Sequence, residues 1–324
     1  MKNLVVFFVA IFVVMALAGS VDARVIDPPD ENRAGKIAGG ASWDTLSTWD
    51  VVKDATANIS GREWWGRIAH FSQDDLFYPL KIGRSQRVYG AIKGVDPLNA
   101  FDEHTPFSAV LVDSCEGAYI FSMAGDSASL AIGEQVVKLF PDIHQKVREF
   151  WGRSDFDLDG RDNTLILVYP FGEVIRPAGF VSTRDIVPIW TPSNGMETIH
   201  LDSRECEQMS QDDLEELLAH EFQHNILLSW DPFDGQWLKE GLAMLGQELA
   251  TGENPYPKGY WDEYGLYSHM EVYRAMLGEW RWDSQHYGSA YYFFRWLYRV
   301  YGMDAILAIM RDPHNGQESI ASVV

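Results

Sequence analysis

The chain has 324 residues, of which 46% are hydrophobic and 13% aromatic. This composition supplies enough apolar side chains for a buried core and excludes a disordered or collagen-like protein. Acidic residues number 47 against 26 basic residues, and the formal net charge is -21. Because a nucleic-acid-binding protein needs a basic face for the phosphates, nucleic acid is not expected as a partner.

The N-terminus has the pattern of a secretory signal peptide. Lys2 precedes an almost unbroken apolar run over residues 4–18, which is shorter than the roughly 20 residues that a membrane-spanning helix needs. The small residues at 16–18 and at 21–23 both resemble cleavage sites. We favour the second, which makes 1–23 the signal peptide and leaves an uncleaved anchor as the alternative. The expected location is secreted or periplasmic, with no stable membrane insertion after cleavage.

The next part of the chain is expected to be extended and then β-rich. Residues 24–42 are rich in Asp, Pro, Gly and Ala, which is typical of a linker. Over 43–125, short apolar runs alternate with turn residues and no long helix is indicated, so a sandwich-like β-rich domain is expected. The predicted strands are Trp65–Phe71, Leu76–Ile82, Arg87–Val95, Phe107–Val112 and Ala118–Met123.

Residues 126–324 are expected to form a second domain, so that the fold class is α+β. Apolar residues at helical spacing predict a helix over 127–151, in which Pro141 predicts a kink or a division into two helices. Strands are predicted at Thr164–Tyr169 and Met196–Asp202. Further helices are expected at 210–228, at 236–250 with a stop at Gly252, and at 287–301 and 304–310.

Two cysteines, Cys115 and Cys206, occur in the sequence. In an oxidising compartment they could form a disulfide. Two buried free thiols are the alternative. Two cysteines are too few for a disulfide-stapled scaffold or a zinc site made of several cysteines.

The motif that carries chemistry is His-Glu-Phe-Gln-His at 220–224. Residues four apart lie on one face of a helix, about 6 Å apart along its axis, so His220 and His224 can bind one metal ion. Glu221 can then reach a water molecule on that metal. Two hydrogen-bonded core histidines are the alternative, but they would leave several buried polar groups to satisfy. We therefore expect Zn2+ as the cofactor.

A catalytic zinc ion needs a third protein ligand, and Glu240 is the candidate. It lies 16 residues after His224, in the sequence Trp-Leu-Lys-Glu-Gly-Leu-Ala at 237–243. A short loop at 230–235 would turn the chain, so that an antiparallel helix presents Glu240 beside the two histidines. A capping or solvent-facing glutamate is the alternative.

These segments resemble a known family. AHEFQH followed by WLKEGLA is similar to the gluzincin zinc metallopeptidases, and most closely to the hyicolysin-type secreted bacterial family, over roughly 127–320. The resemblance implies a thermolysin-like metallopeptidase domain in which His220, His224 and Glu240 bind zinc and Glu221 is the general base. Lys239 departs from the pattern, because many gluzincins have Asn there.

Two further positions follow from the same resemblance. The segment that begins at Tyr287 is spaced like the gluzincin aminopeptidase segment that begins with the transition-state tyrosine, although a packing role is the alternative. Glu197 lies in Gly-Met-Glu-Thr, where aminopeptidases of the clan have Gly-x-Met-Glu-Asn, and its Glu would bind substrate. Gluzincins also place a substrate-binding edge strand there, which implies this role for 196–202. Thr198 replaces the Asn, so an ordinary strand residue is the alternative for Glu197.

An acidic segment at 155–162 makes Ca2+ a second candidate ion. Alternating carboxylates followed by Gly160 match the front half of a calcium loop. The twelfth position is Ile166 instead of Glu, so an EF-hand loop is incomplete and an acidic turn is the alternative. The candidate ligands are Asp155, Asp157, Asp159 and Asp162.

The sequence thus predicts a secreted zinc-dependent peptidase, a hydrolase that cleaves peptide or protein substrates with a zinc-bound water and Glu221 as general base. An endopeptidase is favoured. The alternatives are an aminopeptidase on the same scaffold, and a non-enzymatic binding or adhesion protein that uses 43–125 and has an inert metal site. The intact Glu221 argues against the last.

Overall fold

The computed structural model describes ten parts of the chain: 85–90, 105–152, 163–172, 178–182, 185, 194, 196–231, 234–255, 284–312 and 314–324. The predicted signal peptide and linker lie outside these residues. So do the four candidate calcium ligands, Asp155, Asp157, Asp159 and Asp162. Those predictions remain predictions.

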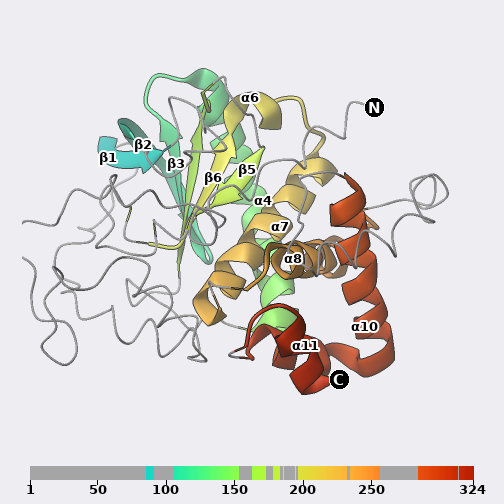
Figure 1. Ribbon diagram of the computed structural model, residues 1–324. Helices are drawn as coiled ribbons and strands as arrows, with labels where there is room; N and C mark the ends of the chain where they lie inside the picture. The colour runs from blue at the N-terminus through green and yellow to red at the C-terminus, as the bar shows by residue number, and fades with distance from the viewer. Residues whose placement is uncertain are drawn as a thin grey trace, which may run out of the picture.

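A mixed six-stranded sheet lies on one side of the described structure (Figure 1). Its order is β1-β2-β3-β4-β6-β5. The three central strands β3, β4 and β6 are parallel, and the other pairings are antiparallel. The strands are β1 (Ser85–Gly90), β2 (Thr105–Cys115), β3 (Ala118–Met123), β4 (Thr164–Tyr169), β5 (Gly179–Val181) and β6 (Thr198–Asp202).

The described strands do not form a separate N-terminal sandwich. β1, β2 and β3 come from the region 43–125, yet β3 pairs in parallel with β4, which lies beyond the predicted domain boundary. Ala118 is paired with Thr164, and Ser122 is paired with Val168. The boundary after residue 125 therefore falls inside one sheet. The structure confirms the mixture of helices and strands, and the rest of 43–125 lies outside the described residues.

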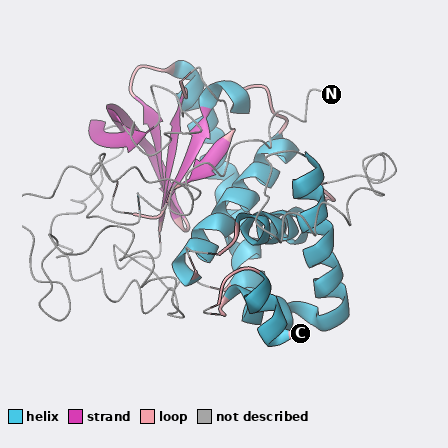
Figure 2. Cartoon of the chain, in the orientation of Figure 1, coloured by secondary structure: helices cyan, strands magenta, loops and turns pink. Residues whose placement is uncertain are grey.

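The described helices gather mainly on one side of the sheet (Figure 2). Helix α4 remains one helix of 25 residues although it contains Pro141, so the predicted alternative of two helices is wrong. Its buried stripe holds both halves in place. The helices are α4 (Ser127–Trp151), α6 (Ser203–Cys206), α7 (Gln211–Trp230), α8 (Gln236–Thr251), α10 (Ser284–Met310) and α11 (Gln317–Val323).

Two glycines end helices where the sequence predicts. Gly252 follows α8 with a φ of 80°, the left-handed conformation that glycine adopts without steric cost. Gly302 breaks α10 with a φ of 81°, which agrees with the two helices expected over 287–301 and 304–310. None of the described helices is long and apolar enough to cross a membrane.

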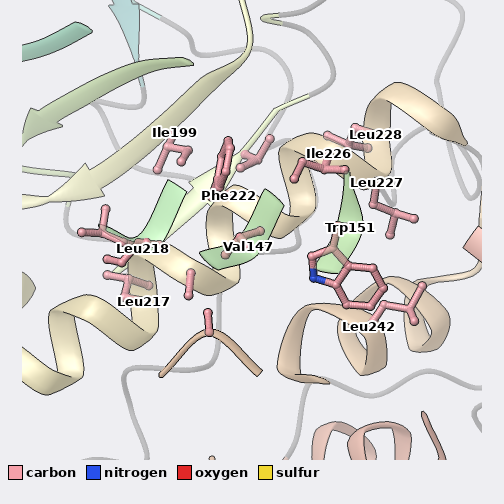
Figure 3. Close-up of a cluster of buried hydrophobic side chains, with 14 of the residues drawn as sticks. Val147, Trp151, Ile199, Leu217, Leu218, Phe222, Ile226, Leu227, Leu228 and Leu242 are labelled. Atoms are coloured by element: carbon pink, nitrogen blue, oxygen red, sulfur yellow. The ribbon is translucent and has the colours of Figure 1, made fainter. Parts of the chain in front are cut away.

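The main hydrophobic core lies between the sheet, α4, α7 and α8. Figure 3 shows side chains from all four in one cluster, with Ile199 of β6 and Val147 of α4 near Phe222 of α7, and Leu242 of α8 beside Trp151 of α4. Along β4, alternate residues belong to this cluster and to a second cluster on the opposite face of the sheet. Both faces of the central strands are therefore buried, which explains the continuous apolar run of β4.

The two cysteines are free thiols and form no disulfide. Cys206 is buried on α6, where its Sγ lies 3.8 Å from the carbonyl oxygen of Ala178. Burial raises the pKa of Cys206 far above its ordinary value, and burial raises the pKa of Cys115 to about 11. Both side chains therefore stay protonated, unreactive thiols near neutral pH.

A close approach between α8 and α10 gives a testable prediction. A Cβ at Gly241 would lie 2.3 Å from Cδ2 of Phe294 and 2.9 Å from the carbonyl oxygen of Ala290. Gly241→Ala is therefore expected to lower the free energy of unfolding by about 1–3 kcal/mol, although alanine normally favours helices. Thermal or urea unfolding measures this change.

Gly252→Ala is the control, because a Cβ there meets nothing within 4 Å and only the positive φ opposes it. This control is expected to cost about 1–2 kcal/mol. A Gly241→Ala protein as stable as the wild type would contradict the close helix contact.

Candidate metal centre

Helix α7 presents the motif because its start is fixed by a capping box. Ser210 Oγ accepts a hydrogen bond from the backbone N–H of Asp213, and Asp213 Oδ2 accepts one from the backbone N–H of Ser210. Asp212 and Asp213 also place negative charge at the positive end of the helix. From Leu217 to Ser229 every residue is buried. The predicted helix is therefore confirmed, and the motif lies in its buried half.

Helix α8 supplies the third candidate ligand. The chain turns after α7, and α8 begins at Gln236 with Gly235 as its N-cap. Helices α7 and α8 pack closely along their lengths. Glu240 lies in the second turn of α8 and is fully buried, so its carboxylate faces the protein interior instead of solvent. The capping or solvent-facing alternative is wrong.

Three side chains converge between these helices. His220 Nε2 and His224 Nε2 are 3.1 Å apart. Glu240 Oε1 lies 3.2 Å from His224 Nε2, and Glu240 Oε2 lies 3.5 Å from His220 Nε2. Within the described part of the chain, this is the group of His, Cys, Asp or Glu side chains that could hold a metal ion. The structure thus brings together the three ligands that the sequence predicts.

The charge of Glu240 suits a metal ligand. Burial alone would raise the pKa of this carboxyl, but the adjacent imidazoles of His224 and His220, in close contact with the carboxylate, lower it below its ordinary value. Glu240 is therefore a carboxylate at neutral pH. Two imidazoles and one carboxylate form a donor set that binds divalent metals.

Glu221 lies next to the centre in a different environment. Burial, with the charge of Glu240, raises the pKa of Glu221 to about 8 against the opposing effect of His220. Neither carboxylate oxygen of Glu221 accepts a hydrogen bond from any described residue. Its stem lies against β5, because a Cβ at Gly179 would be 3.2 Å from Glu221 Cγ. No described protein group therefore donates a hydrogen bond to the carboxyl group of Glu221.

The other two predicted site residues lie outside the ligand group. Tyr287 is buried near the start of α10, the helix that packs on α8, and its catalytic role remains a prediction. Glu197 is also buried, and its carbonyl oxygen accepts a hydrogen bond from the backbone N–H of Leu165. The substrate-binding role of the Glu197 side chain remains a prediction.

The edge strand differs from the expectation. The resemblance implies an edge strand at 196–202, but β6 lies between β4 and β5. β5 is the edge instead, with Gly179 beside Glu221. A strand of three residues carries too little periodicity for detection in the sequence, which explains why β5 was missed.

A buried ionic cluster beside the third ligand was also missed. Lys239 is buried, and burial lowers its pKa to about 8, against the opposing charges of Asp234 and Asp231. Burial, together with the charge of Asp231, raises the pKa of Asp234. Asp234 Oδ1 accepts a hydrogen bond of 3.0 Å from the backbone N–H of Gly316. The loop before α8 is thereby tied to the segment that precedes α11.

A second group of buried, hydrogen-bonded polar side chains lies beside the hydrophobic cluster on the opposite face of the sheet. His200 Nε2 is 2.7 Å from Asp185 Oδ2, and His200 Nδ1 is 2.9 Å from the hydroxyl of Tyr169. Asn194 donates to Asp185 Oδ1 at 2.7 Å, and the ring of Phe180 stacks on His200. These contacts link β4, β5 and β6 to residues 185 and 194. They satisfy buried polar groups, and the sequence offers no motif for them.

No family model matches this chain, and a search of curated proteins finds no relative. The properties of the centre therefore follow from its own residues and geometry.

Metal binding is expected to stabilise the fold, because the ligands converge only in the folded chain. With zinc chloride as the probe at a hundredfold excess over its Kd, the free energy of unfolding should rise by about 2.7 kcal/mol. His224→Ala should abolish this increase, because one of three ligands is removed. His314→Ala is the control, since His314 lies beside Asp312 and outside the ligand group. Thermal unfolding with and without metal measures the effect, and equal stabilisation of His224→Ala would contradict the ligand assignment.

Proposed function

We propose that this protein is a zinc-dependent peptidase with a thermolysin-like catalytic domain, as its resemblance to the gluzincins implies. The observation that carries the proposal is the convergence of two imidazoles and one carboxylate: the two Nε2 atoms are 3.1 Å apart, and the Glu240 oxygens lie 3.2 Å (Oε1) from His224 Nε2 and 3.5 Å (Oε2) from His220 Nε2. Ligand atoms about 2.0–2.1 Å from a tetrahedral zinc ion are about 3.3–3.4 Å from one another. Calcium takes six to eight oxygen ligands at longer distances, so two imidazoles disfavour it here.

The number of ligands supports a catalytic site. Structural zinc sites are closed by four protein ligands, whereas catalytic sites have three and an open position. Among the described residues, the candidate ligands are three: His220, His224 and Glu240. A zinc ion held by them would lower the pKa of a water molecule and polarise a carbonyl group.

Glu221 is the proposed general base. A zinc ion beside it would favour its ionised form, and as a carboxylate it would accept a proton when the water attacks the scissile carbonyl and then deliver that proton to the leaving amine. Burial raises its affinity for the proton, and no described donor competes for its oxygens. The proposed role of Tyr287 is to donate a hydrogen bond to the developing oxyanion.

The edge strand β5 is the proposed site for an extended peptide. Among the described strands, β5 pairs on one side only, with β6. A peptide can therefore add to its other side through main-chain hydrogen bonds. Gly179 leaves β5 without a side chain where the strand meets Glu221. A bound peptide would therefore pass close to the proposed general base. Secretion and endopeptidase specificity are part of the same proposal.

Glu221→Gln tests the proposed mechanism. The amide cannot accept the proton, so kcat should fall by about 10²- to 10⁴-fold while zinc content stays at the wild-type level. Activity is measured on an N-acetylated casein-derived peptide, which an aminopeptidase would not cleave. Zinc content is measured by elemental analysis of the same preparation.

Glu216→Gln is the matched control, because Glu216 lies on the same helix but binds Gln247 instead of facing the metal centre. It should retain activity. Full activity of Glu221→Gln would show that Glu221 is not the base. Zinc binding by the wild type without hydrolysis of either the N-acetylated peptide or the same peptide with a free N-terminus would favour the non-enzymatic alternative.

Gly179→Ala tests the proposed path of the substrate. The added methyl would lie 3.2 Å from Glu221 Cγ and 3.1 Å from the carbonyl oxygen of His200, so it displaces the base or the strand. We expect kcat/KM to fall about tenfold, the equivalent of about 1.4 kcal/mol, with unchanged zinc content. Gly125→Ala is the control, because a Cβ there meets nothing within 4 Å and only its φ of 83° opposes the change, so kcat/KM should stay near the wild-type value. Unchanged kcat/KM in Gly179→Ala would contradict a substrate path along β5.

A further inference from the structure

The third ligand has a hydrogen-bond donor of its own. The side-chain amide nitrogen of Gln236 lies 3.0 Å from Glu240 Oε1, and both side chains are buried. The two residues are four apart on α8, so they lie on one face of the helix. Only the NH₂ end of an amide can donate, and therefore the hydrogen bond also fixes the orientation of the Gln236 amide.

This bond distinguishes the two oxygens of the ligand. Oε1 accepts the hydrogen bond from Gln236 and lies 3.2 Å from His224 Nε2. Oε2 accepts no hydrogen bond from any described residue and lies 3.5 Å from His220 Nε2. A carboxylate held at one oxygen cannot rotate freely, so its other oxygen, Oε2, keeps a fixed direction toward His220.

We propose that Gln236 is a positioning residue that orients Glu240 for metal binding. The proposal rests on the metal binding proposed above and extends it to a residue outside the ligand set. A metal gains affinity when its ligands are held in place before it binds, and partners of the ligands commonly contribute ten- to a hundredfold. Gln236 is neutral, so it holds the carboxylate without cancelling the negative charge that attracts the metal.

The backbone around Gln236 is itself held in place. Gln236 is the first residue of α8 and follows Gly235. Asp234, two residues before Gln236, accepts the hydrogen bond from the backbone N–H of Gly316. The ring of Trp237, the residue after Gln236, stacks on Phe294 of α10. The amide donor therefore starts from an anchored turn, as a positioning group requires.

If Gln236 served only the stability of the helix, its removal would change stability but not metal affinity. Hydrogen bonds between residues four apart stabilise a helix by a small amount wherever they occur. Gln247 provides the comparison, because it is buried on the same helix and its amide donates to Glu216 Oε2 at 2.6 Å. Glu216 is not a ligand. Removal of either amide should change stability, but only removal of Gln236 should change metal affinity.

The experiment compares Gln236→Met with Gln247→Met, because methionine keeps the length of the side chain and removes the donor. The Kd for zinc is measured by competition with a chromogenic chelator, and the unfolding of the metal-free proteins is measured separately. We expect Gln236→Met to raise the Kd about 10- to 100-fold and Gln247→Met to leave it within about twofold. Gln236→Leu provides a second variant at the same position.

The outcomes are distinguishable. If the wild type binds no zinc, the proposed metal site itself fails. If the wild type binds zinc and the Gln236 variants bind it equally well, the positioning role is overturned. If both Gln236 variants fail to fold while Gln247→Met folds, Gln236 serves the fold and the positioning role is likewise overturned.

Discussion

The convergence of three candidate ligand side chains between two buried helices is the constraint on which the rest of this structure depends. Burial of imidazole and carboxylate groups costs free energy unless they have partners. The helices that carry them must therefore be fixed by other contacts. The capping box at Ser210 fixes the start of α7, the sheet and α4 cover its apolar side, and Gly241 lets α10 approach α8. Each of these contacts restricts the position of a candidate metal-binding side chain.

Two carboxylates in this centre have opposite properties although they are neighbours. Glu240 faces both histidines and receives a hydrogen bond from Gln236, and its pKa is lowered. Glu221 has no described donor, and burial raises its pKa. A ligand needs a permanent charge, whereas a base must accept and release a proton. Environments that separate two pKa values in this way are typical of sites that assign separate roles to similar groups.

The sequence predicts those parts of the structure that depend on local patterns. The spacing of His220 and His224, the cap at Ser210 and the stop at Gly252 are helix properties, and the structure confirms them. Strand pairing is not local, so the pattern over 43–125 showed strands but not that β3 pairs with β4. The partner of Glu240 was missed because a glutamine at the start of a helix has no distinctive pattern until its contacts are known.

The hydrogen bond from Gly316 to Asp234 has a consequence for synthesis of the chain. The ligands lie within residues 220–240, but the loop between their helices is held by a residue that is translated much later. Helix α10, which packs on α8, also lies between α8 and Gly316 in the sequence. A growing chain can form α7 and α8 early, yet the bond that anchors their connection forms only after Gly316 has left the ribosome. The connection between the two helices that carry the candidate ligands is thus completed only late in the synthesis of the chain.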